Sequence, residues 1–273
     1  MDNKVDYNDS IEIAEGIYWV GFYDEKAGLH CNPYVIKDNN EAVLIDGGSR
    51  NDFSTVMLKV MRSGIDPQNI SRLIYQHYDP DLCGNIPHME ALINKNDLKI
   101  ISHRENNIFI NYYSTKSKKQ CIEDLGFVFE FSSGRRLRFI RTPYSHSPGS
   151  FVTIDEKTKV LFSSDLFGSY DTNWELFTNI RESCGECEPE RVCPGDGKPC
   201  EIVGIRDFHK RVMTSTRALR YALSLIADLD IDIIAPQHGS VFNTPESKKV
   251  VIDRLKSLEG VGIDGFFEEK SHD

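Results

Sequence analysis

The chain has 273 residues, of which 40% are hydrophobic and 27% are charged, and its formal net charge is -10 at pH 7. This composition is typical of a soluble globular protein, and the length suffices for one large α/β domain or two small ones. The acidic surface repels phosphate backbones and the basic runs at 116–119 and 135–136 are short, so we expect no nucleic-acid partner.

The N-terminal third of the chain predicts β-strands before it predicts a helix. Its first ten residues are polar and acidic, unlike the basic start and apolar stretch of a secretory signal. Stretches rich in β-branched and aromatic residues then predict strands at 11–22, 32–37 and 42–45. Asp46 and the two glycines after it end the last of these, and apolar residues at helical spacing predict a helix at 53–62.

The rest of the chain alternates between strands and helices. A buried strand at 72–75 leads directly to His77. The later elements are a helix at 86–93, strands at 99–102, 137–140, 150–154, 159–162 and 231–235, and one long helix at about 205–226. Thr244 followed by Pro245 predicts the start of a last helix.

Six residues with metal-binding side chains follow four of the predicted strands. Strand ends at one edge of an α/β sheet converge on a common crevice, so residues far apart in sequence meet there. Three imidazoles and three carboxylates in such positions form a metal-ligand set. The six residues are His77, Asp79, Asp81, His146, Asp165 and His238. Pro80 predicts that the first three lie in an irregular loop rather than a helix.

These loops resemble those of the metallo-β-lactamase superfamily and, within it, of the flavodiiron proteins. The first loop reads His77-Tyr78-Asp79-Pro80-Asp81-Leu82, with a carboxylate at the second ligand position, as in the flavodiiron pattern His-x-Glu-x-Asp-His. The run His-Ser-Pro-Gly-Ser at 146–150 is similar to the flavodiiron His-Trp-Pro-Asp-Ser, and 161–168 is close to that family's bridging-aspartate segment. The resemblance covers nearly the whole chain and implies an α/β fold, the four-layer αββα metallo-β-lactamase fold, in a single domain over 1–273.

The resemblance also implies a di-iron centre with an oxo or hydroxide bridge. His77, Asp79 and His146 would bind one iron, Asp81 and His238 would bind the other, and Asp165 would bridge the two. Asp46 would orient a ligand from outside the coordination shell. A carboxylate in place of histidine at Asp79 favours iron over zinc, and three carboxylates offset three of the four positive charges of two ferrous ions.

Two features depart from the flavodiiron pattern. Leu82 stands where that family has a histidine, which leaves one coordination position open for a small molecule, unless His88 supplies the ligand instead. The sequence also ends at Asp273, where flavodiiron proteins continue into a flavodoxin-like domain, so we expect no FMN. With these two departures, the chain resembles the stand-alone di-iron proteins that bind oxygen.

The implied function is dioxygen binding, as an oxygen or redox sensor of an anaerobe. The resemblance points to a chemotaxis receptor or a redox protein as the partner and is compatible with a homodimer. Whether the protein is an enzyme stays open, because it could be an oxygen or nitric oxide reductase fed by an iron-sulfur cluster in the same chain. A zinc hydrolase of the same superfamily is a third hypothesis, although it would require histidine at position 79.

Four cysteines lie within 17 residues, at Cys184, Cys187, Cys193 and Cys200, in a segment at about 181–204 that has no periodicity and is predicted to be an insertion. Such spacing is typical of a metal-ligand cluster rather than a disulfide framework. A [4Fe-4S] cluster is the favoured occupant, with zinc or a single iron as alternatives. Seven cysteines in all and the short apolar stretches predict a cytoplasmic protein without a membrane segment.

Three tyrosines close to the ligand loops are candidates for hydrogen bonds to a bound oxygen ligand. They are Tyr75, Tyr78 and Tyr144. The alternative is that they only pack against their neighbours, as tyrosines at strand ends commonly do.

Overall fold

The computed structural model describes residues 5–24, 28–114, 116–170, 174–178, 180–188, 191–193, 195 and 197–270. The chain folds into two compact units, of which the first comprises Met1–Tyr23 and Cys31–Leu137 and the second comprises Asp24–His30 and Arg138–Asp273. Each unit has a buried hydrophobic core made from its own residues. A single domain over the whole chain therefore stays a prediction.

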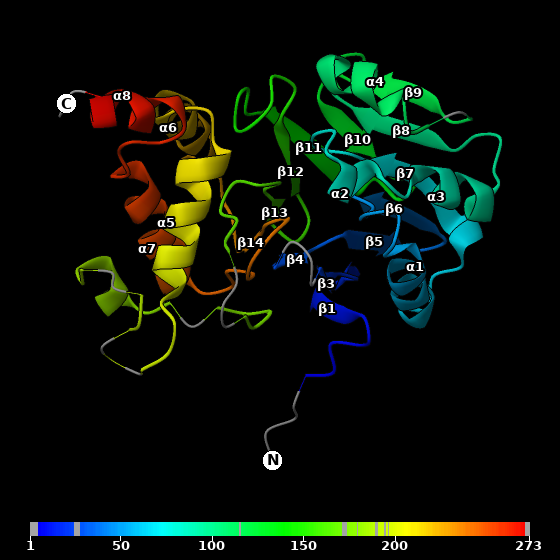
Figure 1. The fold of residues 1–273 in the computed structure, drawn as a ribbon. Coiled ribbons are helices and arrows are strands. Elements are labelled where there is room, and N and C mark those ends of the chain that lie inside the picture. The colour runs from blue at the N-terminus through cyan, green and yellow to red at the C-terminus, as the bar shows by residue number, and fades with distance from the viewer. Residues whose placement is uncertain are drawn as a thin grey trace. The chain divides into compact units, whose positions relative to one another are not determined.

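Seven strands of the first unit form one sheet in the order β1-β2-β5-β6-β7-β8-β9 (Figure 1). They are β1 (Ile11–Ala14), β2 (Ile17–Trp19), β5 (Tyr34–Asp38), β6 (Glu41–Ile45), β7 (Ile70–Ile74), β8 (Lys99–Ser102) and β9 (Lys118–Cys121). The pairs from β1 to β6 are antiparallel, whereas β6, β7, β8 and β9 pair in parallel. Parallel pairing brings the carboxyl ends of β6 and β7, and hence Asp46 and His77, to the same edge of the sheet.

The helices of the first unit cover its sheet with apolar faces. They are α1 (Phe53–Arg62), α2 (Pro80–Cys83), α3 (Ile86–Ile93), α4 (Arg104–Ile110) and the short 3-10 helix η1 (Pro67–Asn69), and β10 (Val128–Glu130) follows them. The structure gives α1 and α3 the bounds that the sequence predicts. The expected loop is confirmed for His77 and Asp79 but wrong for Asp81, since α2 begins at Pro80: proline is tolerated at the first helical position, where its missing N–H is not needed.

The second unit contains strands that lie next to one another in the order β11-β12-β13-β14. They are β11 (Arg136–Arg141), β12 (Phe151–Asp155), β13 (Val160–Phe162) and β14 (Ile233–Ala235). β13 is antiparallel to β12 and parallel to β14, so the residues before β12 and after β13 and β14 leave the sheet at one edge. Two further strands, β3 (Phe22–Asp24) and β4 (Leu29–Cys31), pair with each other.

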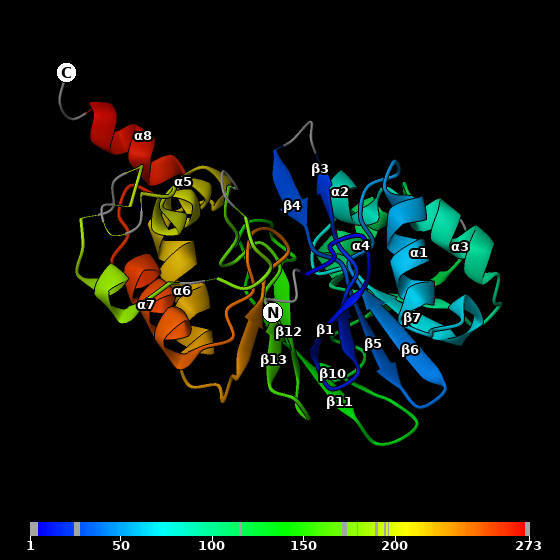
Figure 2. The same cartoon turned by 90° about the horizontal axis from the view of Figure 1, so that it is seen from below.

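Helices α5, α6 and α7 pack together on the strands of the second unit (Figures 1 and 2). The helices are η2 (Glu182–Gly185), α5 (Glu201–Val212), α6 (Thr216–Ile226), α7 (Pro245–Lys256) and α8 (Ile263–Lys270). The prediction of one long helix at 205–226 is wrong, because Met213 is extended and the Ser215 side chain caps α6 by accepting a hydrogen bond from Ala218 N. The predicted start of α7 at Thr244-Pro245 is confirmed, although α8 follows it.

None of the helices in the described part of the chain is both long enough and apolar enough to cross a membrane.

Candidate metal-binding site

Three of the predicted ligands lie at the start of α2 in the first unit. His77 is buried in the loop after β7, and its Nε2 lies 4.0 Å from Asp79 Oδ2. Asp79 is the residue before the helix, and its carbonyl oxygen accepts hydrogen bonds from Leu82 N and Cys83 N. Asp81 lies in the first helical turn. The short helix therefore fixes where both carboxylates leave the backbone.

Asp46 anchors the loop that carries His77. Its backbone N–H donates to Ile74 O, and its carboxylate accepts hydrogen bonds from the backbone N and the side-chain Nε2 of Gln76, at 3.2 and 3.4 Å. Asp46 is almost wholly buried and has a left-handed backbone with φ 55°. Gln76, the residue before His77, was not singled out by the sequence, and its hydrogen bonds join the His77 loop to Asp46.

Leu82 and its neighbour Cys83 are buried in the core of the first unit. Burial, and to a lesser extent the negative charge of Asp46, raises the pKa of the Cys83 thiol, which therefore stays protonated and donates to His77 O at 3.8 Å. His88 is exposed on α3, with its ring tilted against Phe53 of α1 at a centroid distance of 5.2 Å. Its burial in this core is consistent with a packing role for Cys83.

The other three predicted ligands converge within the second unit. His146 precedes β12, Asp165 follows β13 and His238 follows β14, all at the same edge of the sheet. His146 Nε2 lies 3.0 Å from Asp165 Oδ2, and His238 Nε2 lies 3.7 Å from Asp165 Oδ1. Each oxygen of one carboxylate thus faces a different imidazole.

A backbone carbonyl determines which nitrogen of His238 carries the proton. His238 Nδ1 lies 3.0 Å from His30 O, and because a carbonyl oxygen can only accept, Nδ1 is the protonated nitrogen. In the neutral ring the lone pair then lies on Nε2, the atom that faces Asp165. Histidine ligands of metals are commonly oriented by such a hydrogen bond through the second ring nitrogen.

Trp174 supports both ends of this arrangement. Its indole stacks on the His30 ring, with centroids 3.5 Å apart and an interplanar angle of 9°, and its Nε1 donates to Gly239 O at 2.9 Å. Trp174 therefore holds both His30, which orients His238, and Gly239, which follows His238 in the chain. Neither His30 nor Trp174 belongs to a motif, so their roles were not predicted.

His209 is a buried histidine that fixes the loop after Asp165. Its Nε2 accepts a hydrogen bond from Phe167 N at 3.0 Å, so its Nδ1 must donate to Ile205 O, 2.7 Å away. Burial lowers the pKa of His209 to about 4, which keeps the ring neutral near pH 7. The sequence did not predict this role.

Four of the eight non-glycine residues with positive φ in the described part of the chain lie in or beside the ligand loops. Non-glycine residues with positive φ include Asp46 (55°), Tyr144 (64°), Ser164 (56°) and Phe167 (71°). Such conformations cost energy and are characteristic of functional sites, where the surrounding structure imposes them.

The candidate tyrosines differ in their surroundings. Tyr75 is wholly buried in the core of the first unit, where burial raises its pKa well above the usual range. Tyr78 packs at the edge of that core and stacks on Phe109 at 4.3 Å. Tyr144 is exposed, and its carbonyl accepts a hydrogen bond from Thr214 Oγ1. A role for any of them beside a bound ligand stays a prediction.

The cysteine-rich segment surrounds a pocket of about 200 Å³ in the second unit. Three of its thiols, those of Cys184, Cys193 and Cys200, line this pocket together with Arg181 and Lys198. All four cysteines belong to the described part of the chain, and no three of their sulfur atoms lie within 4.8 Å of one another. Cys200 is the residue before α5, so the last four residues of the predicted insertion belong to that helix.

Arg254 of α7 holds the Cys184–Cys187 turn from outside. Its Nε and Nη2 donate to Cys184 O at 3.1 and 2.7 Å, and Nη2 also donates to Cys187 O and lies 3.9 Å from Cys187 Sγ. One guanidinium thus fixes two carbonyls of the turn and adds a positive charge beside a thiol.

Imidazole and carboxylate side chains gather at the ends of sheet strands, where they could hold metal ions. A family model described as ODP family beta lactamase matches residues 29–239, and the chain belongs to this family. The structure titled as the peroxy diiron species of the chemotaxis sensor ODP superposes with a TM-score of 0.76 at 23% identity, covering 96% of this chain and 99% of that one. The predicted fold class is confirmed.

Curated relatives confirm the resemblance to flavodiiron proteins. An uncharacterized protein of Methanocaldococcus jannaschii is 28% identical over 244 residues, which cover 85% of this chain and 56% of the relative. The anaerobic nitric oxide reductase flavorubredoxin of Salmonella paratyphi B is 26% identical over 255 residues, covering 85% of this chain and 48% of that protein. The chain therefore spans about half the length of these relatives.

Proposed function

We propose that the protein holds two iron ions and binds dioxygen. The ligands would be His77, Asp79 and His146 for one iron and Asp81 and His238 for the other, with Asp165 as the bridge. The arrangement of Asp165 carries the proposal, because each of its carboxylate oxygens faces the Nε2 atom of a different histidine. A carboxylate that bridges two metal ions through its two oxygens would present one oxygen to the ligands of each ion, as Asp165 does.

The chain's own residues prepare this set for metal binding. The His30 carbonyl holds His238 as the tautomer whose Nε2 can coordinate, and His209 holds the loop after Asp165. Asp46 positions Gln76 and hence the His77 loop. Ferrous ions, once bound, supply the electrons and the coordination position that dioxygen requires.

The donor types favour iron over zinc. Zinc sites of hydrolases are rich in imidazole, whereas the proposed set contains as many carboxylates as imidazoles, which suits a harder ion of higher coordination number. The position at Leu82 is wholly buried and apolar. His88 is exposed and tilted against Phe53, which argues against its use as a substitute ligand and favours an open coordination position.

A sensory role is the favoured use of dioxygen binding. Membership of the ODP family and the fold shared with a chemotaxis sensor support it. A sensor has to retain the ligand long enough to signal, whereas a reductase has to turn it over. The physiological partner would then be a receptor or another signalling protein rather than an electron donor.

Oxygen exposure of iron-loaded protein tests this proposal. The diferrous protein, prepared without oxygen and mixed with one equivalent of dioxygen, should develop a visible absorption band that persists. Asp165→Asn should bind less than two irons and give no band, whereas the matched variant Asp207→Asn, on the exposed side of α5, should behave as the wild type. Rapid repeated oxygen consumption with a simple reductant would identify a reductase, and hydrolytic activity with stoichiometric zinc would reject iron chemistry.

The four clustered cysteines support a second metal centre, for which we propose a [4Fe-4S] cluster. Zinc, with Zn–S bonds of about 2.3 Å, would require sulfur atoms roughly 4 Å apart. No three of the four thiols lie within 4.8 Å of one another, and three of them line a pocket of about 200 Å³, which favours a larger inorganic group. The cationic side chains of Arg181, Lys198 and Arg254 would offset the thiolate charge.

Such a cluster would favour the alternative of an oxygen or nitric oxide reductase, since it could deliver electrons in place of a flavin. The similarity to a flavorubredoxin, named as a nitric oxide reductase, supports this alternative. Iron, sulfide and zinc analysis of anaerobically isolated protein tests the cluster. Six irons and four sulfides per chain are expected, whereas two irons, one zinc and no sulfide would reject it.

A further inference from the structure

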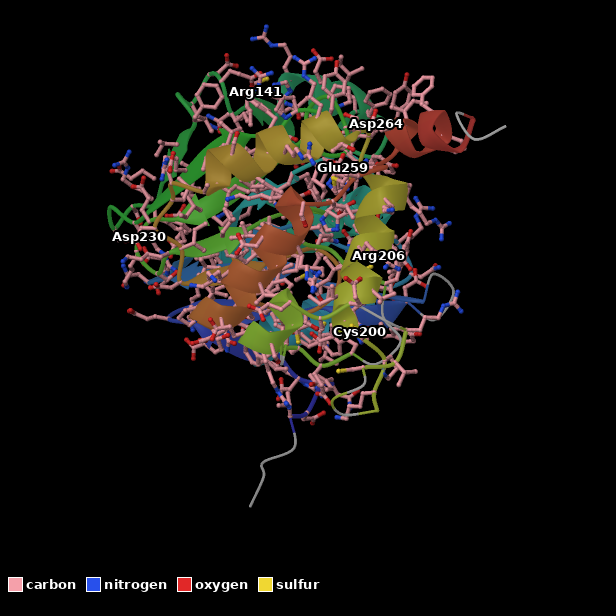
Figure 3. All side chains as sticks on the ribbon, turned by 90° about the vertical axis from the view of Figure 1, so that its left-hand side faces the viewer. Arg141, Cys200, Arg206, Asp230, Glu259 and Asp264 are labelled. Carbon is pink, nitrogen blue, oxygen red and sulfur yellow. The ribbon has the colours of Figure 1, made fainter. Side chains whose placement is uncertain are left out.

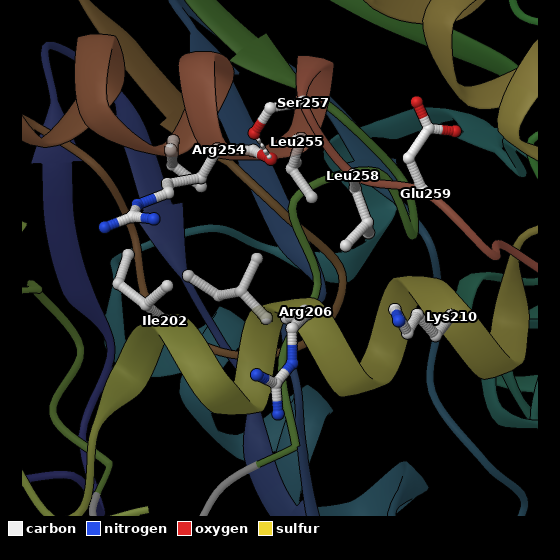
Figure 4. A pocket seen from close by; sticks show the side chains of 10 residues that line it. Ile202, Arg206, Lys210, Arg254, Leu255, Ser257, Leu258 and Glu259 are labelled. Carbon is white, nitrogen blue, oxygen red and sulfur yellow. Dashed lines mark hydrogen bonds between the residues drawn. The ribbon is translucent and has the colours of Figure 1, made fainter. Parts of the chain in front are cut away.

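A second pocket, of about 190 Å³, lies between α5 and α7 in the second unit (Figures 3 and 4). Its floor is apolar and consists of buried residues of both helices, namely Ile202, Ile205, Val251 and Leu255, with Leu258 at one side. The proposed iron ligands and the cysteines do not line it. A concave site with an apolar floor binds hydrocarbon, because it removes apolar surface from water.

The rim of this pocket is positively charged although the protein as a whole is acidic. Arg206, Lys210 and Arg254 line the rim, and the one acidic lining residue, Glu259, is paired with Arg220. Arg254 donates hydrogen bonds to the cysteine-rich turn, and Arg206 forms an ion pair with Asp207. Among the described residues, the Lys210 ammonium has neither a hydrogen-bond nor an ion-pair partner.

Lys210 is therefore the cation that is available to a ligand. Figure 4 shows Lys210 on α5 across the pocket from Leu258 and Glu259, toward the opposite end of the pocket from Ile202. A charge at the rim next to buried aliphatic groups matches a molecule with an anionic head and a hydrocarbon tail. The volume, below the roughly 300–1,000 Å³ of drug-sized pockets, limits that tail to a short chain.

We propose that this pocket binds a short-chain aliphatic carboxylate, with the carboxylate at Lys210 and the chain over Ile205, Val251 and Leu255. The site would give the protein a second input that is independent of iron and dioxygen. Binding of the carboxylate involves no change in oxidation state and no covalent step. The charge selects anions, and the apolar floor selects among them by chain length.

Titration of the full-length wild-type protein with hexanoate, followed by calorimetry or NMR shifts, tests the proposal. Saturable binding at one site is expected. Affinity should rise about fourfold for each methylene from butyrate to hexanoate, because each buried methylene contributes that factor. Acetate, which has the charge without the chain, and hexanol, which has the chain without the charge, should each bind at least about tenfold more weakly.

Two variants and one control locate the site. Lys210→Glu should weaken hexanoate binding at least about tenfold, and Leu258→Trp should block it by filling the pocket. Lys249→Glu makes the same charge change at an exposed position of α7 outside the pocket and should leave the affinity unchanged. Absence of saturable hexanoate binding, or equal affinity of wild type, Lys210→Glu and Leu258→Trp, would overturn the proposal, as would equal affinity for acetate and hexanoate.

Discussion

Hydrogen bonds to single atoms determine what the histidines of the second unit can do. His238 keeps Nε2 for a metal because its Nδ1 donates to His30 O, whereas His209 uses both ring nitrogens for the backbone. Two histidines of the same unit therefore have opposite roles, one as a candidate ligand and one as a structural residue. Residue type alone does not distinguish the two roles, because they depend on the hydrogen-bond partners of the ring nitrogens.

The neutral state of His209 makes the stability of the metal-free protein depend on pH. Its folded-state pKa of about 4 lies below the ordinary value of 6.5, so the unfolded chain takes up the proton first as the pH falls. The free energy of unfolding should therefore fall by about 3 kcal/mol between pH 6.5 and 4, from about 1.4 kcal/mol per pKa unit. Urea denaturation across this range measures the loss.

His209→Gln serves as the reference for that measurement, because an amide can replace both hydrogen bonds but does not titrate. The other histidines titrate equally in the two proteins, so the difference between their pH profiles isolates His209. Parallel profiles would show that His209 is not the group responsible.

Arg254 should control how firmly the cysteine-rich segment retains the metal centre proposed for it. Arg254→Gln removes the positive charge beside Cys187 and most of the hydrogen bonds to the Cys184 and Cys187 carbonyls. Residues that orient ligands typically contribute about 10- to 100-fold in metal affinity, so loss of the metal to a chelator should accelerate by a comparable factor. Arg206→Gln, whose arginine pairs with Asp207 instead, should lose metal at the wild-type rate.

At the level of elements, the break between α5 and α6 shows where local patterns fail. Apolar periodicity continues from one helix into the next, and so it predicted one helix. Met213 is extended instead, and the Ser215 hydroxyl begins α6. The break also brings the Thr214 hydroxyl to Tyr144 O, two residues before His146, and thus links a helix end to a ligand loop.

Loss of the cap at Ser215 should destabilise this region. Ser215→Ala leaves Ala218 N without its side-chain acceptor and should lower the free energy of unfolding by about 1 kcal/mol. Ser224→Ala, at an exposed position within α6, should change it by less than about 0.5 kcal/mol. Chemical denaturation of both variants under one set of conditions makes the comparison, and equal losses would show that the cap contributes nothing.

On the scale of the whole molecule, the proposed iron ligands come from both compact units. A metal that binds the folded state alone stabilises it by mass action, by about 4 kcal/mol when free iron exceeds its dissociation constant a thousandfold. Iron-loaded protein should therefore unfold at a higher temperature than metal-free protein under anaerobic calorimetry. In Asp165→Asn, iron should raise the unfolding temperature much less than in the wild type. An equal rise in that variant would show that Asp165 is not a ligand.

The sequence by itself determined the strand ends that carry the candidate ligands and the bounds of α1 and α3, and it indicated the fold class through the resemblance of its ligand loops to a known family. The strand ends and helix bounds follow from short-range periodicity and capping residues, which a linear pattern records. It also singled out the four cysteines, through their spacing alone. It misjudged Pro80 and the division of α5 from α6, because a proline and an unbroken apolar stripe are each compatible with two local structures.

Tertiary structure decided the protonation of His238, the buried neutral state of His209 and the attachment of Arg254 to the cysteine-rich turn. Each depends on a contact between residues far apart in the chain: His238 with His30 across 208 positions, His209 with Phe167 across 42, and Arg254 with Cys184 across 70. Such contacts leave no trace in local composition, since hydrogen-bond partners are chosen by packing. The candidate ligands and Asp46 could thus be named from the sequence, whereas His30, His209 and Arg254, which hold the surrounding loops, could not.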